Sequence, residues 1–223
     1  MSKAKVGIVV FPGSNCDHDA YYVFNDILKV DTKFLWHKDS GVGDRSIIIL
    51  PGGFSYGDYL RGGSIARFSN IMRDVIRFAN NGGVVVGICN GFQILCEAGL
   101  LPGVLIKNAN LQFICSTVSL NVVNNNSIFT KYYNKGDEIK IPIAHGEGNF
   151  LCSKETLDEM NENDQILFTY NDNPNGSLAD IAGIQNKNKN VMGMMPHPER
   201  ASDAILGNTD GRGILQSIAE SVL

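Results

Sequence analysis

Short apolar runs rich in β-branched residues alternate with longer amphipathic stretches over the first part of the chain. Each short run is almost continuously apolar, which is typical of strands that are buried on both faces of a sheet. Runs of this kind predict strands at Lys5–Phe11, Thr32–Trp36, Ser46–Leu50 and Gly83–Ile88.

Two amphipathic stretches lie between these runs. Residues Asp17–Lys29 and Ile71–Ala79 place apolar side chains at the spacing of one helix face. Strands that alternate with helices in this way form βαβ units, in which the strands are parallel. The stretch Phe11–Cys16 has two interpretations: either Ser14 or Asn15 caps the first helix, which we favour, or the stretch is a loop that faces the substrate.

The middle of the chain, from Val104 to Phe150, has little helical periodicity and contains turn-forming asparagine and glycine residues. We therefore expect antiparallel strands there. Beyond it the pattern predicts a surface helix at Glu155–Asn163, strands at Gln165–Tyr170, Leu178–Gln185 and Val191–Met195, and a last helix at Gly213–Leu223. Since no linker or repeat interrupts the pattern, the prediction is one α/β domain over residues 1–223, with a mostly parallel central sheet and added antiparallel strands.

Composition and charge narrow the classes of function. The 223 residues are 43% hydrophobic and 19% charged, which is close to an average globular protein and argues against disordered and fibrous chains. The 19 Lys and Arg residues and 23 Asp and Glu residues give a net charge of −4. Because no block of basic residues occurs, nucleic acid is not an expected partner.

The apolar runs are also too short for a membrane protein. None approaches the roughly 18 to 20 residues that span a bilayer, and Val6–Phe11 is too short for a signal peptide, so we expect a strand there. The five cysteines form no C-x-x-C pair and no regular disulfide framework. These features favour free thiols and a location in the reducing cytoplasm.

Cys89 is the strongest candidate for a catalytic nucleophile. It is the centre of Gly87-Ile-Cys-Asn-Gly91, which connects a predicted strand to a helical stretch. Small flanking residues allow a sharp turn that presents the central side chain at the start of a helix, and a helix N-terminus beside an imidazolium favours the reactive thiolate form of a cysteine. The alternative is a tight strand-to-helix turn with a buried cysteine.

A thiol nucleophile requires a base, and the chain has four histidines. His197 is the best candidate because it follows an apolar strand and precedes Glu199 by two residues, so that the carboxylate can orient the ring. His145 lies in a glycine-flanked turn that could line a site. His18 and His37 are expected to be structural or surface residues. The alternative for His197 is a surface pair in a turn shaped by prolines.

Acyl transfer also requires N–H donors for the developing oxyanion. The backbone N–H of Asn90 follows the nucleophile at the predicted helix start, and Gly52 or Gly53 in the turn after the third strand could supply the second donor. This glycine-rich turn lacks the G-x-x-x-x-G-K-[ST] pattern of a P-loop, so ATP binding by this chain is not expected. No spacing of cysteine and histidine is typical of a zinc site, and no metal is expected.

Three motifs together resemble the class I (triad) glutamine amidotransferases. They are the turn Pro51-Gly-Gly53, the elbow Gly87–Gln93 of the form G-x-C-x-G-x-Q, and the late His197-Pro-Glu199. Further segments are similar to one subgroup of this family, the small glutaminase subunits of a purine-biosynthetic synthetase, and the similarity runs from the first strand to the last helix. These segments are Phe11–Cys16, Gly53–Arg61, Ala66–Phe68, Ala144–Gly148, Asn173–Ser177 and Met194–Arg200.

The resemblance implies a flavodoxin-like three-layer fold and a catalytic triad of Cys89, His197 and Glu199. In the reaction it implies, the thiol attacks the side-chain amide of glutamine, ammonia leaves, and water hydrolyses the resulting γ-glutamyl thioester. For the oxyanion hole of this reaction we expect the backbone N–H groups of Gly53 and Asn90. The substrate-binding residues that the resemblance implies are Gln93, Gly148 and Asn149.

The resemblance also implies partners. A separate synthetase subunit would consume the ammonia with ATP and Mg²⁺, and a small third subunit would bridge the two, while this chain itself holds no cofactor. Two other functions fit the same motifs: a free-standing cysteine hydrolase of γ-glutamyl or other small acyl substrates, and a catalytically silent binding subunit. Turnover without a partner would indicate the first, and unchanged cellular function after Cys89→Ala would indicate the second.

Overall fold

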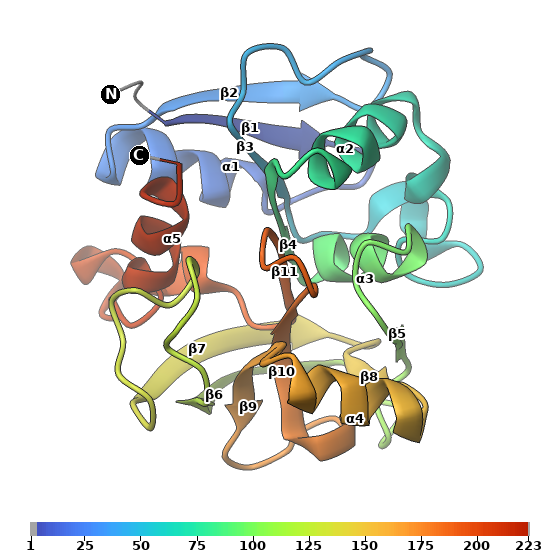
Figure 1. The fold of residues 1–223 in the computed structure, drawn as a ribbon, viewed down its shortest axis with the longest axis vertical. Coiled ribbons are helices and arrows are strands. Elements are labelled where there is room, and N and C mark those ends of the chain that lie inside the picture. Colours follow the sequence, from blue (N-terminus) through green and yellow to red (C-terminus); the bar gives the residue numbers. More distant parts are fainter. Residues whose placement is uncertain (1–3, 223) are drawn as a thin grey trace.

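The computed structural model describes residues 4–222, and within them a nine-stranded sheet forms the centre of the fold. The strand order is β2-β1-β3-β4-β11-β10-β9-β6-β7. Helices cover both faces of the first half of this sheet, so that the chain has the three-layer α/β architecture that was expected (Figure 1). A separate two-stranded ribbon, β5-β8, lies beside it.

One half of the sheet is parallel, as the alternation of strands and helices predicts. It consists of β1 (Lys5–Val10), β2 (Asp31–Trp36), β3 (Ile47–Leu50), β4 (Val84–Ile88) and β11 (Val191–Met194). Burial on both faces is confirmed for β3 and β4, in which every residue is buried. The same prediction is wrong for β2, because β2 is the edge strand and leaves Phe34 and Trp36 exposed.

The other half of the sheet is antiparallel, which confirms the expectation for the middle of the chain. It contains β6 (Ile114–Val122), β7 (Glu138–His145), β9 (Ile166–Tyr170) and β10 (Ile181–Gln185), and the ribbon pairs β5 (Val104–Ile106) with β8 (Asn149–Leu151). The strand expected from Leu178 begins three residues later, since Leu178–Asp180 form a 3₁₀ turn in which Ala179 has a φ of 51°.

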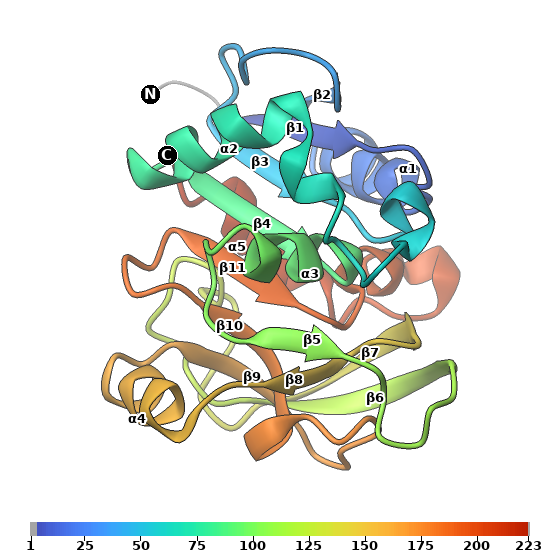
Figure 2. The same ribbon diagram turned by 90° about the vertical axis from the view of Figure 1, so that its right-hand side faces the viewer.

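The helices form the two outer layers. On one face, α1 (Asp17–Tyr21) continues as a π-helix over Tyr22–Ile27 and lies near α5 (Arg212–Ala219); on the other are α2 (Asn70–Asn80) and α3 (Asn90–Glu97) (Figures 1 and 2). The remaining α-helix, α4 (Lys154–Glu162), lies beside the antiparallel strands. Among the described residues, none of the helices has the length and apolar character needed to cross a membrane.

The turn before α1 differs from the favoured prediction. Neither Ser14 nor Asn15 caps the helix, because the N-cap position is Cys16 and no side-chain cap bond forms. The Ser14 hydroxyl instead accepts a hydrogen bond from the backbone N–H of Phe11 at 3.1 Å, which stabilises the turn that follows β1. The remaining interpretation of Phe11–Cys16 is a loop that faces the substrate.

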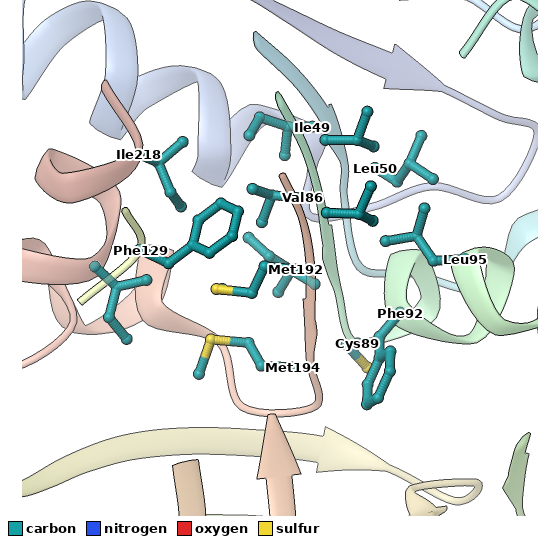
Figure 3. Close-up of a cluster of buried hydrophobic side chains, with 14 of the residues drawn as sticks. Ile49, Leu50, Val86, Cys89, Phe92, Leu95, Phe129, Met192, Met194 and Ile218 are labelled. Carbon is teal, nitrogen blue, oxygen red and sulfur yellow. The ribbon is translucent and has the colours of Figure 1, made fainter. Parts of the chain in front are cut away.

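A continuous hydrophobic core fixes the position of the central strands. Ile49, Val86 and Met192 from three neighbouring parallel strands lie close together, with Phe129 on one side and Cys89 at the end of the cluster (Figure 3). All of these side chains are buried, and each large apolar one contributes about 1.5 to 3 kcal/mol relative to exposure. The core therefore holds the ends of β3, β4 and β11 in a fixed arrangement.

The carboxyl ends of the parallel strands meet at one edge of the sheet. The segments that follow β1, β3, β4 and β11 begin there with Phe11, Pro51, Cys89 and Met195. In open α/β sheets this edge is where ligands bind. The fold thus gathers at one place the four segments that carry the sequence motifs.

Helix α3 begins in very close contact with β3, which leaves no room for a side chain at Gly91. A Cβ atom built there would lie 1.9 Å from the carbonyl oxygen of Leu50. We therefore expect Gly91→Ala to lower the free energy of unfolding by about 3 kcal/mol or more, because the clash is with backbone and no rotamer relieves it. Urea denaturation followed by circular dichroism measures this change.

Gly146→Ala is the matched control for stability. A Cβ atom there would meet no atom closer than 3.8 Å, at Phe113, so the free energy of unfolding should stay close to that of the wild type. Equal unfolding midpoints for the two variants would contradict the steric argument.

Candidate active site

Cys89 lies at a sharp turn between β4 and α3. Its backbone has φ 51° and ψ −106°, a conformation that non-glycine residues rarely adopt and that is typical of functional sites. Its N–H donates to the carbonyl of Met194 at 2.7 Å, which ties the turn to β11. The thiol points toward Ala144, with 3.8 Å between Sγ and the carbonyl oxygen, and the residue is 5% exposed. The strand–turn–helix context expected of a nucleophile elbow is therefore present.

His197 and Glu199 follow β11, the strand next to β4. The ring nitrogen Nδ1 of His197 lies 2.6 Å from Oε1 of Glu199, and the two side chains are only 2% and 1% exposed. The backbone N–H of His197 donates to the carbonyl of Pro142 at 2.8 Å, and this bond holds the backbone of His197 against β7. The surface-pair alternative for His197 is therefore wrong, because both groups are buried.

The imidazole ring and the Cys89 thiol meet above the turn at Gly52. A Cβ atom built on Gly52 would lie 2.7 Å from Cε1 of His197 and 3.4 Å from Cβ of Cys89. Within the described residues Nε2 of His197 has no hydrogen-bond partner, so this nitrogen is available for proton transfer. Cys89, His197 and Glu199, which follow one another in this order along the chain, therefore lie close together in space.

Charge partners stabilise the protonated form of His197. Burial acts to lower the pKa of the ring, but the Glu199 carboxylate and the neighbouring thiols of Cys89 and Cys16 outweigh burial and raise the pKa well above its usual value. A histidine in this state can hold a proton and deliver it to a leaving group.

The two expected oxyanion donors lie beside the thiol. Gly53 lines both cavities next to Cys89, and its φ of 142° suits glycine because a Cβ there would be 2.8 Å from backbone atoms of Ser14 and Asn15. Asn90 is the first residue of α3. Neither backbone N–H has an acceptor among residues 4–222. Both donors are thus available, and their role in catalysis stays a prediction.

One cavity beside Cys89, of about 130 Å³, contains the expected Gln93. The side chain of Gln93 donates to the carbonyl of Glu147 at 2.7 Å and accepts from Asn90 at 2.8 Å. The other lining residues are Gly53, Phe54, Asp58, Phe113, Ala144, His145, Gly146 and Glu147.

Gly148 and Asn149, the other two expected substrate-binding residues, do not line this cavity. The N–H of Gly148 donates to Asn108 at 2.9 Å, and Asn149 begins β8 and packs near Gly176. The turn therefore presents its preceding residues, Gly146 and Glu147, to the cavity. A glycine-rich sequence predicts a turn without indicating which of its residues face inward.

A second cavity, of about 150 Å³, lies on the His197 side of the nucleophile. Asn15 and Cys16 line it, so the stretch before α1 is a loop that faces the site. Arg200 donates to the sulfur of Cys16 at 3.0 Å and to the carboxylate of Asp19 at 3.1 Å. The local sequence of Cys16 does not indicate this contact, because Arg200 lies 184 positions later in the chain.

Cys16, His197 and Glu199 form a group of three possible metal ligands whose atoms lie within 4.8 Å of one another. The group is better described as a hydrogen-bonded unit, because Glu199 already binds the ring and the Arg200 guanidinium binds the thiol. Burial raises the pKa of Cys16, which favours the neutral thiol.

The remaining histidines have distinct roles. His145 lines the first cavity, as its glycine-flanked turn suggested, and burial together with the charge of His197 lowers its pKa to about 4. His37 is buried and lies 2.6 Å from the hydroxyl of Tyr56, which confirms a structural role. His18 is a surface residue, with a side chain that is 82% exposed.

Sequence comparison with known proteins finds a glutamine amidotransferase domain and relatives that share one name. The CobB/CobQ-like glutamine amidotransferase domain matches residues 3–213. The chain is 60% identical over 214 residues to phosphoribosylformylglycinamidine synthase subunit PurQ of Alkaliphilus metalliredigens, covering 96% of this chain and 95% of that protein. It is 50% identical over 228 residues to the subunit of the same name from Salinibacter ruber, covering 98% and 97%.

A solved structure agrees with these similarities. A chain in the structure of PurLQS from Thermotoga maritima matches with a TM-score of 0.91 and 42% identity, covering 100% of both chains. A glutamine amidotransferase from the same organism matches with a TM-score of 0.60 at 16% identity, which shows a shared fold.

Glu199→Gln should lower the pKa of His197. The carboxylate is the main charge that opposes burial, so its removal lets burial shift the equilibrium toward the neutral ring. In the wild type, the ring should remain protonated at a pH above its usual pKa of about 6.5, and in the variant it should lose its proton at a lower pH. Titration of the ring Cε1–H signal by NMR, assigned with His197→Gln, measures both midpoints. Coincident midpoints would contradict the assigned role of Glu199.

Proposed function

This chain belongs to the CobB/CobQ-like glutamine amidotransferase family, and we propose that it is the glutaminase subunit of phosphoribosylformylglycinamidine synthase. The observation that carries the proposal is the convergence of Cys89, His197 and Glu199 at the carboxyl edge of the sheet, in a chain that is similar over its whole length to subunits of that name. On this proposal, residues 1–223 form one glutaminase domain.

The chemistry begins with attack of the Cys89 sulfur on the side-chain amide carbon of glutamine. A carbon–sulfur bond forms, and the developing oxyanion accepts hydrogen bonds from the N–H groups of Gly53 and Asn90. His197 holds the thiol proton, with its ring oriented by Glu199, and transfers that proton to the amide nitrogen. The carbon–nitrogen bond then breaks, ammonia leaves, and a γ-glutamyl thioester remains on the sulfur.

Hydrolysis of the thioester uses the same groups in the reverse order. His197 takes a proton from water as the water oxygen attacks the thioester carbonyl, and the oxyanion again lies against Gly53 and Asn90. The carbon–sulfur bond breaks, the proton returns to sulfur, and glutamate leaves. The second cavity, which His197 lines, offers space for the water and the departing ammonia.

The ammonia is used by a partner on this proposal. A PurL-type synthetase subunit converts formylglycinamide ribonucleotide to formylglycinamidine ribonucleotide with ATP and Mg²⁺, and a PurS-type subunit bridges the two. The similarity to a chain of PurLQS from Thermotoga maritima supports this assembly. The five free cysteines support a cytoplasmic location for it.

Exposed aromatic side chains beside the active site also support a partner. Phe54 and Phe113 line both cavities next to Cys89, are 44% and 55% exposed, and stack with 6.4 Å between ring centroids. Tyr59 and Leu60, in the loop after β3, are 73% and 94% exposed. Exposed large apolar side chains are typical of surfaces that a second protein covers, and Phe54 and Phe113 place such a surface at the two cavities.

Cys89→Ala should abolish glutamine-dependent activity while ammonia-dependent activity of the assembled complex remains. The nucleophile is needed to release ammonia from glutamine, whereas added ammonium chloride bypasses that step. We expect glutamate release to fall by at least about a thousandfold. The assay measures glutamate and formylglycinamidine ribonucleotide in the complex with the synthetase, bridging subunit, acceptor ribonucleotide, ATP and Mg²⁺.

Cys115→Ala is the matched control, because Cys115 is an exposed thiol on β6 and should leave both activities unchanged. The wild-type chain alone should release glutamate slowly, and mixing with its partners should accelerate the release. No acceleration by competent partners would overturn the assignment of the complex. Rapid hydrolysis of other γ-glutamyl compounds by the chain alone would instead identify a free-standing hydrolase.

A further inference from the structure

Cys16 is buried next to the catalytic groups, although the proposed reaction does not use its thiol. The residue is 3% exposed and lines the second cavity together with Cys89 and His197. Its Sγ lies 3.1 Å from the Cβ position built on Gly52, and Cε1 of His197 lies 2.7 Å from the same point. The sulfur and the catalytic imidazole are therefore close neighbours.

The sulfur of Cys16 also lies beside the carboxylate that orients the ring. Sγ, a ring nitrogen of His197 and a carboxylate oxygen of Glu199 all lie within 4.8 Å of one another. Nδ1 of the ring is bonded to Glu199, whereas Nε2 has no partner among the described residues. Because one hydrogen bond tolerates a range of angles, it does not by itself fix the tilt of the ring. The neighbouring sulfur supplies a second constraint.

Arg200 holds this sulfur in place. Its Nη2 donates to Sγ of Cys16 at 3.0 Å, and its Nε donates to Oδ2 of Asp19, in the first turn of α1, at 3.1 Å. The guanidinium thus joins the start of α1 to the 3₁₀ turn Pro198–Ala201. The backbone N–H of Cys16 donates to the carbonyl of Gly52 at 3.3 Å. Residues from three segments therefore determine the position of the sulfur.

The electrostatics of the ring agree with these contacts. Burial acts to lower the pKa of the catalytic ring, and Glu199, Cys89 and Cys16 outweigh it. A sulfur that accepts a hydrogen bond favours the charged form of the donor. The titratable and charged side chains around the ring are those of Cys16, Cys89, His145, Glu199 and Arg200.

We propose that Cys16 is a positioning residue for the catalytic imidazole, because its sulfur keeps the protonated His197 ring turned toward Cys89. Arg200 in turn holds the sulfur. The proposal rests on the glutaminase function and adds a residue outside the triad. The ring gives a proton to the amide nitrogen and later takes one from water, and both transfers require Nε2 to face the reacting atoms. Cys16 itself gives and takes no proton.

The experiment measures kcat and KM for glutamine in the assembled complex with Cys16→Ala and Cys16→Ser. Alanine removes the sulfur beside the ring, so kcat should fall about ten- to a hundredfold, as expected for a misaligned catalytic group, while KM stays close to that of the wild type. Serine keeps an acceptor at the same place and should recover most of the lost kcat.

The pH profile separates positioning of the ring from a general loss of structure. The alkaline limit of kcat/KM reports loss of the ring proton. In Cys16→Ala this limit should move to lower pH, because one of the groups that raise the pKa of His197 is gone. A role in packing alone would lower kcat without moving the limit.

Arg200→Met tests the link between the guanidinium and the sulfur. Methionine keeps most of the length of the side chain and removes its charge, so kcat should fall as in Cys16→Ala. The double variant should be no slower than the single ones, since both changes act through the same sulfur. Losses that multiply would contradict this link. Arg200 is only half-buried, so this variant tests the proposal even if Cys16→Ala does not fold.

Cys152→Ala is the matched control, because Cys152 is a half-buried thiol between β8 and α4 that lines neither cavity. Its kcat, KM and pH profile should equal those of the wild type. Ammonia-dependent activity of the complex should be unchanged in every variant, which reports intact folding and assembly. Wild-type kcat in Cys16→Ala, or a lower kcat with an unmoved pH limit, would overturn the proposal. A wild-type complex that fails to hydrolyse glutamine would instead refute the proposed function.

Discussion

The backbone turn at Cys89 is the constraint on which the rest of the site depends. A non-glycine residue with φ 51° is held there because β4 is buried on both faces and α3 starts against the carbonyl of Leu50. The hydrogen bond from Cys89 to Met194 fixes the same turn to β11. Strain of this kind, about 1 to 3 kcal/mol for such a residue, persists only where surrounding packing determines the conformation.

The two halves of the sheet supply different parts of the site. The parallel half ends in the thiol, the imidazole and the glycine-rich turn, which together perform the bond-breaking steps. The antiparallel half supplies Ala144 to Glu147, from the end of β7 and the turn that follows it, as the wall of the first cavity. Charge differs between the two cavities, since Arg200 and the protonated His197 line one of them and the carboxylates of Asp58 and Glu147 line the other.

Much of this arrangement could be predicted from the sequence. Buried apolar runs identify β3 and β4, and the carboxyl ends of parallel strands necessarily share one edge, which brings Cys89 and His197 together. The exposed β2 could not be recognised because strand order depends on packing between elements that are distant in sequence. Apolar content alone indicates a strand and does not indicate its place in the sheet.

The missed site residues have a common physical reason. Cys16 meets Arg200 across 184 positions of the chain, and Asp58 meets Glu147 only through the geometry of two loops. A charged residue in a loop is usually solvated, so its local sequence does not distinguish a cavity wall from a surface. The same reason applies at shorter range to the turn that contains Gly148. Pairing of β5 with β8 sets which residues of this turn face the cavity, and the sequence of the turn does not indicate that pairing.

The position of β11 has a consequence for how the molecule acquires activity. This strand is the last of the sheet in the chain, yet it lies at the centre, between β4 and β10, and joins the two halves. During synthesis on the ribosome, the earlier strands emerge first and remain two separate groups. Because His197 and Glu199 follow β11 directly, sheet closure and assembly of the catalytic groups occur together, and an unfinished chain releases no ammonia.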